Sequence, residues 1–171
     1  MNTTPDSATL PSFYSGYVAH VAHLSIADAL KWSNEQLLKT LRTLPEEKGT
    51  YAYAPGKWTV KEVICHLMDA ERIFAYRALR FARNDNTELP GFDETSYAPE
   101  SNAHARTLSQ LIEEAKRLRA TTIDLFNSFT PDMLKRTGVA NNNLVSVLNI
   151  GYIIAGHEMH HLSVMKSRYG I

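Results

Sequence analysis

Apolar residues recur at helical spacing in four long stretches of this chain, and no window alternates in the manner of a β-strand. The stretches cover residues 14–44, 58–81, 107–129 and 146–165. Each has one apolar stripe, so each must bury one face against a neighbour. Four such helices pack most simply against one another, and the sequence therefore predicts an all-α fold, a four-helix bundle.

Signals at the starts of three stretches place their boundaries. Thr59 with Glu62, and Thr107 with Gln110, have the spacing of a capping box, in which the two side chains satisfy free backbone N–H groups of the first turn. Ser146 has the residue type of a helix N-cap, and the fourth helix is expected to start around it.

The length of 171 residues predicts a single domain. Residues 1–12, which include Thr, Ser, Asp and two prolines, are expected to form a flexible leader, and residues 13–171 a single four-helix-bundle domain. The first helix is expected to bend near Ser25–Ile26 and to stop at Pro45. The connection between helices 2 and 3, about 83–106, is long for a bundle, so we expect it to span the bundle and to rim a site.

Charge and cysteine content limit the classes of function. The 18 basic residues balance 18 acidic ones, which removes the electrostatic reason to expect nucleic-acid binding. No run of 18 apolar residues is present, so no membrane span is expected. Cys65 is the one cysteine and cannot form an intrachain disulfide, which favours a reducing, cytoplasmic location.

Three histidines lie inside the apolar stripes of two helices. His157 follows Ile154 by three residues and His161 precedes Val164 by three, so both face the interior. His66 has the corresponding phase on the second helix. An unpaired buried imidazole costs about 1–3 kcal/mol, and three that converge need a group to accept their lone pairs. The pattern predicts one divalent metal ion per chain, held by these three histidines and left with an open coordination position.

Each histidine taken singly has a plainer interpretation, because a lone histidine on an apolar face is usually a satisfied core residue. The matching phase on two helices is what favours metal ligation. His160 could replace His161 as the partner of His157, but it rotates off the stripe and is expected at the rim of the site. The other histidines are expected on the surface or in packing contacts (His20, His23 and His104).

Three residues near the cluster are candidate catalytic residues that could move protons, namely Glu158, Asp69 and His160. Asp69 and Glu62 lie one turn either side of His66, where either could orient its ring through a hydrogen bond. A solvated helix face fits both carboxylates equally well.

Other charged residues of the second and third stretches give weaker signals. Arg72, Tyr76 and Arg77 are candidates for the mouth of a pocket. Arg119 is expected on a solvated face, as part of a basic cluster that pairs with nearby glutamates (Lys116, Arg117, Glu113 and Glu114).

Residues 157–161 also match the H-E-x-x-H string of zinc peptidases. A peptidase would need a third ligand downstream, yet residues 162–171 contain no His, Asp or Glu. It would also need an edge strand to hold an extended peptide, and Glu158 lies about 100° off the histidine stripe. The peptidase reading is therefore the least favoured.

Three segments carry a family resemblance: APGKWTVKEVICHLMDAERIFAYRALRFAR (54–83), LPGFDE (89–94) and YIIAGHEMHHLSVMKSRY (152–169). Together they resemble the DinB/YfiT-like superfamily of metal-dependent four-helix proteins. The resemblance implies an antiparallel four-helix bundle, a homodimer, and a zinc or nickel ion held by three histidines. Carried onto this chain, these are His66, His157 and His161.

The resemblance also bears on activity. The superfamily includes thiol-dependent transferases and isomerases as well as members described as metal-dependent hydrolases. We therefore expect a metal-dependent enzyme that acts on a small molecule, either as an S-transferase with a low-molecular-weight thiol as cosubstrate or as a hydrolase. The alternative is a non-catalytic stress protein that binds metal or a small ligand.

Overall fold

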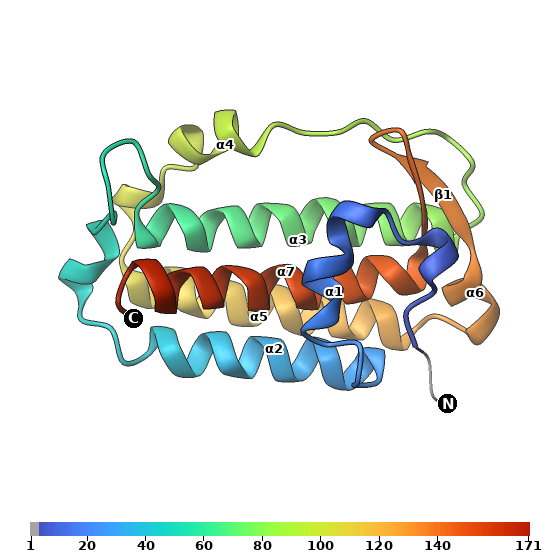
Figure 1. Cartoon of the computed structure of the whole chain (residues 1–171), viewed down its shortest axis with the longest axis horizontal. Helices are drawn as coiled ribbons and strands as arrows, with labels where there is room; N and C mark the ends of the chain where they lie inside the picture. Colours follow the sequence, from blue (N-terminus) through green and yellow to red (C-terminus); the bar gives the residue numbers. More distant parts are fainter. Residues whose placement is uncertain (1–3) are drawn as a thin grey trace.

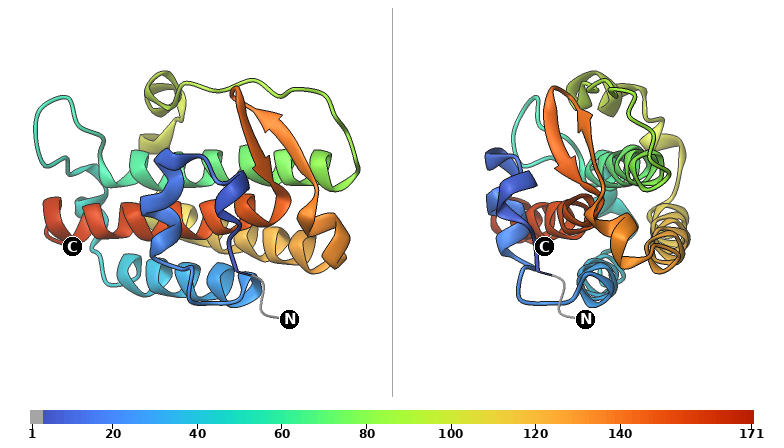
Figure 2. Two further views of the ribbon diagram at one scale, coloured as in Figure 1. Left: turned by 45° about the vertical axis from the view of Figure 1, so that its right-hand side comes forward. Right: turned by 90° about the vertical axis from the view of Figure 1, so that its right-hand side faces the viewer.

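The computed structural model describes residues 4–171 and contains four long helices, which confirms the predicted bundle. They are α2 (Ile26–Leu41), α3 (Val60–Ala82), α5 (Leu108–Asn127) and α7 (Val147–Arg168). Seen end-on, they occupy the corners of a square in which α7 and α5 each lie between α2 and α3 (Figures 1 and 2). Both capping boxes form, and Ser146 caps α7, so the predicted starts of α3, α5 and α7 are confirmed.

Helices α3 and α5 run in the same direction, which corrects the antiparallel arrangement that the family resemblance implied. Glu46, just after α2, accepts a hydrogen bond from the backbone N–H of Leu108 (2.8 Å) and pairs with Lys61 (2.6 Å), so α3 and α5 begin side by side. At the same end of the bundle, the Tyr169 hydroxyl donates to the Trp58 carbonyl. Helices α2 and α7 therefore both end where α3 and α5 begin.

The long connection between α3 and α5 makes this topology possible. It leaves the end of α3, runs back along the bundle and includes α4 (Glu94–Glu100) and the 3-10 turn η4 (Ala103–Ala105), as Figure 1 shows. A short turn at the end of α3 would have forced the next helix to run antiparallel. Because the connection returns the chain to the other end, α5 starts level with α3.

The first helical stretch is two helices, which corrects the expectation of one bent helix. The chain forms α1 (Ser15–Ala19), turns, and starts α2 afresh, with the Ser25 side chain accepting a hydrogen bond from the backbone N–H of Asp28. Helix α1 crosses α7 (Figure 1), and at the crossing a Cβ on Gly156 would collide with the Tyr17 carbonyl oxygen. The expected bend at Ser25 is thus a full break, because α1 packs against the outer face of α7.

The N-terminal segment before α1 is joined to the start of α7. It contains the 3-10 turns η1 (Ser7–Thr9) and η2 (Ser12–Tyr14). Asn149 exchanges two hydrogen bonds with the backbone of Asp6, at 3.0 and 2.7 Å, and donates to Thr9. These bonds lie within the part of the expected flexible leader that the structure describes.

A small β-hairpin precedes α7 and corrects the expectation that the chain has no strand. After α5 the short helix α6 (Pro131–Lys135) leads into β1 (Thr137–Ala140), which pairs antiparallel with β2 (Asn143–Ser146). The two linking residues, Asn141 and Asn142, both have left-handed backbone conformation, as a two-residue hairpin turn requires. Strands of four residues are too short to give a clear alternating pattern. The main sequence signal for the hairpin is therefore the run of asparagines at its turn, residues 141–143.

The hairpin also fixes the long connection. Leu89 donates to the Val139 carbonyl and accepts from Asn141 N–H, forming a parallel bridge beside β1.

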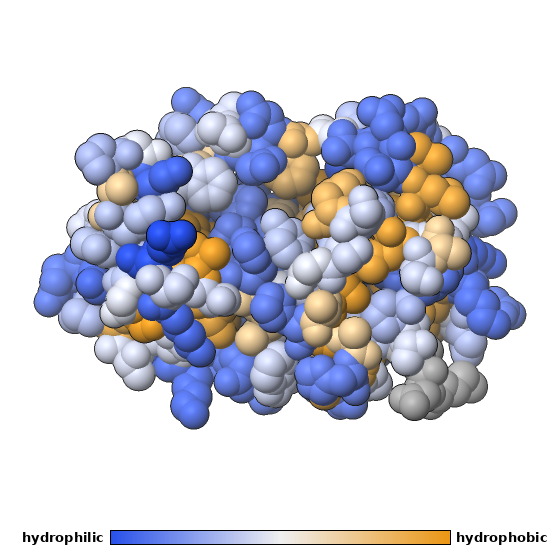
Figure 3. Space-filling model, in the orientation of Figure 1, coloured by the Kyte–Doolittle hydropathy of each residue, from blue (hydrophilic) through white to orange (hydrophobic). Residues whose placement is uncertain are grey.

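Over most of the face in Figure 3 the surface is hydrophilic, and hydrophobic residues gather in its right half, where the N-terminal turns and the hairpin lie. Across residues 4–171, none of the helices combines the length and the apolar character that crossing a membrane demands.

Candidate metal centre

The three histidines predicted to face the interior meet at one point between α3 and α7. The Nε2 atom of His157 lies 3.1 Å from Nε2 of His66 and 3.1 Å from Nε2 of His161. One nitrogen from each ring lies within 4.8 Å of the other two. The convergence expected from helical phase is therefore present.

The histidines occupy a break in the apolar core. Side chains of α7 up to Ala155 pack in one hydrophobic cluster, and those from Leu162 onward pack in a second. His157 and His161 fall between them, and His66 faces the same level from α3. The imidazole of His66 packs against Trp58, with ring centroids 4.8 Å apart, which helps to fix its orientation.

The spacing of His157 Nε2 from each of the other two nitrogens fits ligands of a single ion. Two nitrogens about 2.05 Å from one zinc ion at a tetrahedral angle would lie about 3.3 Å apart, and octahedral coordination would bring them to about 2.9 Å. The observed 3.1 Å separations fall between these values. Three nitrogen donors of this type suit zinc, nickel and other late divalent ions.

The surroundings of the cluster keep its rings neutral. Burial lowers the pKa of His66, and Glu94 opposes this in part. Burial, followed by the charge of neighbouring imidazoles, lowers the pKa of His161 to about 3 and that of His157 well below its ordinary value. At neutral pH all three rings therefore offer a lone pair rather than a positive charge.

The cluster opens into a cavity of about 330 Å³. The bundle supplies its floor, and three segments outside the bundle supply the walls: the N-terminal turns with Phe13 and Tyr14, the long connection with Gly91, Phe92 and Glu94, and the hairpin with Asn141. The prediction that the long connection rims a site is thus confirmed. A volume of this size is at the lower end of the range for small-molecule pockets.

Of the three candidate proton-transfer residues, His160 is the one that lines this cavity. Its ring lies 4.5 Å from the ring of Tyr17 and 5.3 Å from that of His161. Burial lowers its pKa, with a smaller contribution from His20, so it is a neutral base at neutral pH. Its place at the rim agrees with the position inferred from helical phase.

Glu158 lies in a buried ion-pair network instead of the cavity. Its carboxylate accepts hydrogen bonds from Arg119 (2.7 Å) and Asn34 (3.2 Å), and 4% of the residue is exposed. Arg119 also forms a two-point bond with Glu71, at 2.8 and 2.9 Å. The carboxylate of Glu158 is therefore committed to joining α7 to α5 and α2.

Arg119 corrects the expectation of a solvated basic face. It is 2% exposed and also donates to the Leu30 carbonyl and the Ser33 hydroxyl. Burial opposes its charge, but Glu158 and Glu71 outweigh that effect and hold the pKa of the guanidinium above its ordinary value. The neighbouring Lys116 and Arg117 are exposed, as expected.

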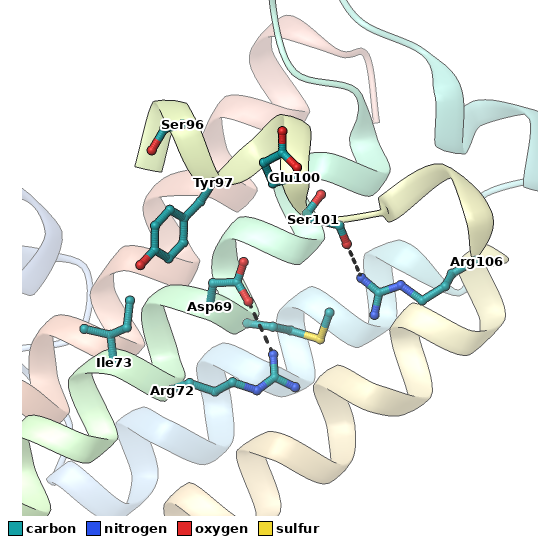
Figure 4. Close-up of a pocket in the computed structure, with 9 residues that line it drawn as sticks. Asp69, Arg72, Ile73, Ser96, Tyr97, Glu100, Ser101 and Arg106 are labelled. Atoms are coloured by element: carbon teal, nitrogen blue, oxygen red, sulfur yellow. Dashed lines mark hydrogen bonds and ion pairs between the residues drawn. The ribbon is translucent and has the colours of Figure 1, made fainter. Parts of the chain in front are cut away.

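Neither carboxylate flanking His66 bonds to that ring, so the expected orienting bond is not formed. Glu62 is engaged by Thr59 in the capping box. Asp69 pairs with Arg72 at 3.6 Å, and burial raises its pKa. Asp69 faces a second cavity of about 700 Å³ between α3 and α4, into which Tyr97 also points (Figure 4).

The pocket-mouth candidates on α3 have separate environments. Arg72 lines the second cavity, and Tyr76 is exposed and bonds to Arg80. Arg77 lines the histidine cavity and is 5% exposed. Tyr14, Tyr17 and Glu94 were missed as site residues, because they come from segments whose position over the bundle has no local sequence signal.

The chain is thus a four-helix bundle with an internal cavity lined by histidines. The family model of the DinB superfamily matches residues 29–165, and the chain belongs to the DinB superfamily.

Two curated relatives come from Oceanobacillus iheyensis, and both carry names that propose a metal-dependent hydrolase. OB0413 is 25% identical over 153 residues, which is 84% of this chain and 86% of that protein. OB0782 is 32% identical over 148 residues, which is 80% of this chain and 83% of that protein.

A solved structure shares the fold. YfiT from Bacillus subtilis, described as a probable metal-dependent hydrolase with an unusual four-helix-bundle topology, superimposes with a TM-score of 0.71 at 16% identity. The superposition covers 94% of this chain and 88% of YfiT. The same-direction pairings of α3 with α5 and of α2 with α7 distinguish this chain from a simple up-and-down bundle.

Proposed function

We propose that this chain is a metal-dependent hydrolase of a small molecule, with one divalent ion held by His66, His157 and His161. The observation that supports this is the convergence of three neutral imidazole nitrogens within 4.8 Å at the floor of an open cavity. The names of the Oceanobacillus iheyensis relatives and of YfiT agree with it.

The ion would supply Lewis-acid chemistry, lowering the pKa of a coordinated water or thiol and polarising an electrophile. His66, His157 and His161 would hold the ion at the floor of the cavity, beside the space that a substrate would enter. The aromatic walls would bury the apolar part of a substrate. His160, which is neutral and lines the cavity, would take up a proton in this reaction.

The bonding of Glu158 argues against the peptidase interpretation of residues 157–161. A zinc peptidase needs this glutamate free to act as a base, whereas here Arg119 and Asn34 engage both of its oxygens. The third histidine also comes from α3, far upstream, instead of from the residues after His161.

Metal content of the purified chain tests the site. We expect close to one zinc or nickel ion per chain, and we expect His157→Ala to abolish it because this ring contacts both partners. His104→Ala is the control, because His104 is exposed, lies next to Glu62 and is not part of the histidine cluster. Full metal content in His157→Ala would refute the assignment.

Activity of the loaded protein tests the reaction. We expect the metal-loaded wild type to hydrolyse members of a panel of small esters and amides, and His157→Ala to be inactive. After the metal is removed, adding it back should restore activity in the wild type and not in His157→Ala. Turnover that requires an added low-molecular-weight thiol would instead favour the S-transferase expected from the family resemblance. Bound metal with neither activity would favour a non-catalytic binding protein.

A further inference from the structure

Arg77 is a buried cation in the histidine cavity that has no carboxylate partner. It lies on the same face of α3 as His66, with about 16 Å of helix rise between their Cα atoms. Its residue is 5% exposed, yet no Asp or Glu oxygen in residues 4–171 comes within 4.0 Å of the guanidinium. A buried charge without a partner is costly and is normally paired.

The hydrogen bonds of Arg77 are largely unused. One N–H group of its Nη2 donates to the Pro90 carbonyl at 2.7 Å, and the guanidinium lies 5.6 Å from the ring centre of Phe74. A guanidinium has five N–H donors, so the described residues leave most of them without an acceptor. No fully enclosed side-chain nitrogen or oxygen of the described chain lacks a partner, so these N–H groups are not fully enclosed, and Arg77 is among the residues that line the cavity.

The position of the guanidinium is fixed. Pro90 follows Leu89, whose backbone N–H and carbonyl both form hydrogen bonds with the hairpin. The Pro90 carbonyl therefore holds one edge of the fork in place, and Phe74 supports its face. A planar cation with a fixed free edge is the group that proteins use to bind carboxylates at two points.

The other groups around Arg77 suit an anion at this end of the cavity. The Tyr14 hydroxyl lies close enough for the charge of Arg77 to lower its pKa against the larger, opposite effect of burial. Asn141 contributes an amide to the same wall. The histidine rings, including His160, are neutral, and Arg77 is the one Lys or Arg among the residues that line the cavity.

Glu94 is the acidic group nearby. It is exposed at the first turn of α4, and its charge acts to raise the pKa of Tyr14, Tyr17 and His66. The negative charge of Glu94 would repel an anion in the cavity, although solvent weakens this repulsion because Glu94 is exposed, whereas Arg77 is buried. Removing the charge of Glu94 should therefore strengthen the binding of an anion.

We propose that Arg77, with Tyr14 and Asn141 beside it, forms a binding subsite for the carboxylate group of a compact, partly apolar organic acid. Phe13, Phe74 and Phe92 surround the apolar part of such a ligand, and the histidine cluster faces its other end. The inference rests on the proposed function only in taking this cavity as the place where the substrate binds.

Binding of a carboxylate to the metal-free full chain tests the subsite without involving the metal. The probe is 3-phenylpropionate, with 3-phenylpropionamide as the uncharged match and inorganic phosphate as a second anion, measured at pH 7.5 by calorimetry and by two-dimensional amide NMR. We expect the carboxylate to bind at least tenfold more tightly than the amide, because charged hydrogen bonds are the stronger class.

Variants assign the effect to Arg77. Arg77→Gln, which removes the charge and keeps a polar side chain, should reduce carboxylate affinity at least tenfold and leave amide affinity unchanged. The carboxylate affinity of Arg77→Lys should fall between those of the wild type and Arg77→Gln. Arg83→Gln removes an exposed cation at the end of the same helix and should have no effect. Glu94→Gln should raise carboxylate affinity.

Several results would overturn the proposal. These are equal affinities for carboxylate and amide, undiminished carboxylate affinity in a folded Arg77→Gln variant, or a loss of stability in Glu94→Gln without tighter binding, which would make Glu94 the partner of Arg77. Tighter binding of phosphate with the same dependence on Arg77 would overturn the choice of carboxylate. Because His157→Ala should keep the affinity, failure of the metal site and failure of this subsite are separable.

Discussion

The buried charges around Arg119 make a quantitative prediction about stability. Arg119 is 2% exposed and gives hydrogen bonds of 2.7 to 2.9 Å to Glu71, Glu158, the Leu30 carbonyl and Ser33. Arg119→Met would keep most of the volume of the side chain but leave two carboxylates facing each other without their cation. Breaking a buried ion pair from one side costs about 3–5 kcal/mol.

That loss is large for a domain whose whole stability is about 5–15 kcal/mol. For a chain of this length each kcal/mol corresponds to about 2–4 °C, so the midpoint of thermal unfolding should fall by about 6–20 °C. Urea denaturation followed by far-ultraviolet circular dichroism would give the free energy of unfolding. Arg117→Met is the matched control, because Arg117 is exposed on the same helix, and it should change the free energy by less than about 0.5 kcal/mol.

A further variant separates lost ion pairs from lost packing. Adding Glu71→Gln and Glu158→Gln to Arg119→Met removes the unpaired carboxylates, so at pH 7 the triple variant should be more stable than Arg119→Met alone. A cost of less than about 1 kcal/mol for Arg119→Met, or no recovery of stability when both glutamates are neutralised, would contradict a stabilising role of these buried ion pairs.

Two further perturbations have expected outcomes. The pKa of His161 in the folded chain is lowered to about 3, below its unfolded value of about 6.5, so its contribution to stability is complete above pH 6.5 and is lost as pH falls towards 3. In metal-free protein, the free energy of unfolding of the wild type should therefore fall faster with decreasing pH than that of His161→Gln. The difference in slope should reach up to about 1.4 kcal/mol per pH unit between pH 6 and 4.5, as measured by urea denaturation. Equal slopes for the two proteins across this range would contradict the lowered pKa. Gly156→Ala should destabilise the chain by about 1–3 kcal/mol, because the added Cβ would meet the backbone of Tyr17 and force α1 away from α7. Gly16→Ala is the control and should be neutral or slightly stabilising, because Gly16 has open space around it. Equal effects of the two variants on the urea midpoint would argue against the close crossing of α1 and α7.

Much of the bundle could be predicted from sequence because its signals are local. A capping box acts within four residues, so Thr59 and Thr107 mark helix starts wherever the helices pack. Helical phase likewise places His157 and His161 on one face of α7 without knowledge of its neighbours. The hairpin was missed because its strands are four residues long, and the left-handed asparagines at its turn were its main local trace.

Which residues form helices and which helix faces turn inward could be inferred from the sequence, since both follow from backbone geometry over a few turns. The pairing of charges in the core and the segments that enclose the site depend on how the helices and loops pack together. Arg119 and Arg117 have the same local appearance, yet one binds Glu71 and Glu158 in the interior and the other is solvated. The difference depends on groups supplied by other helices, and contacts between residues far apart along the chain leave no periodic signal within the helix that carries the arginine.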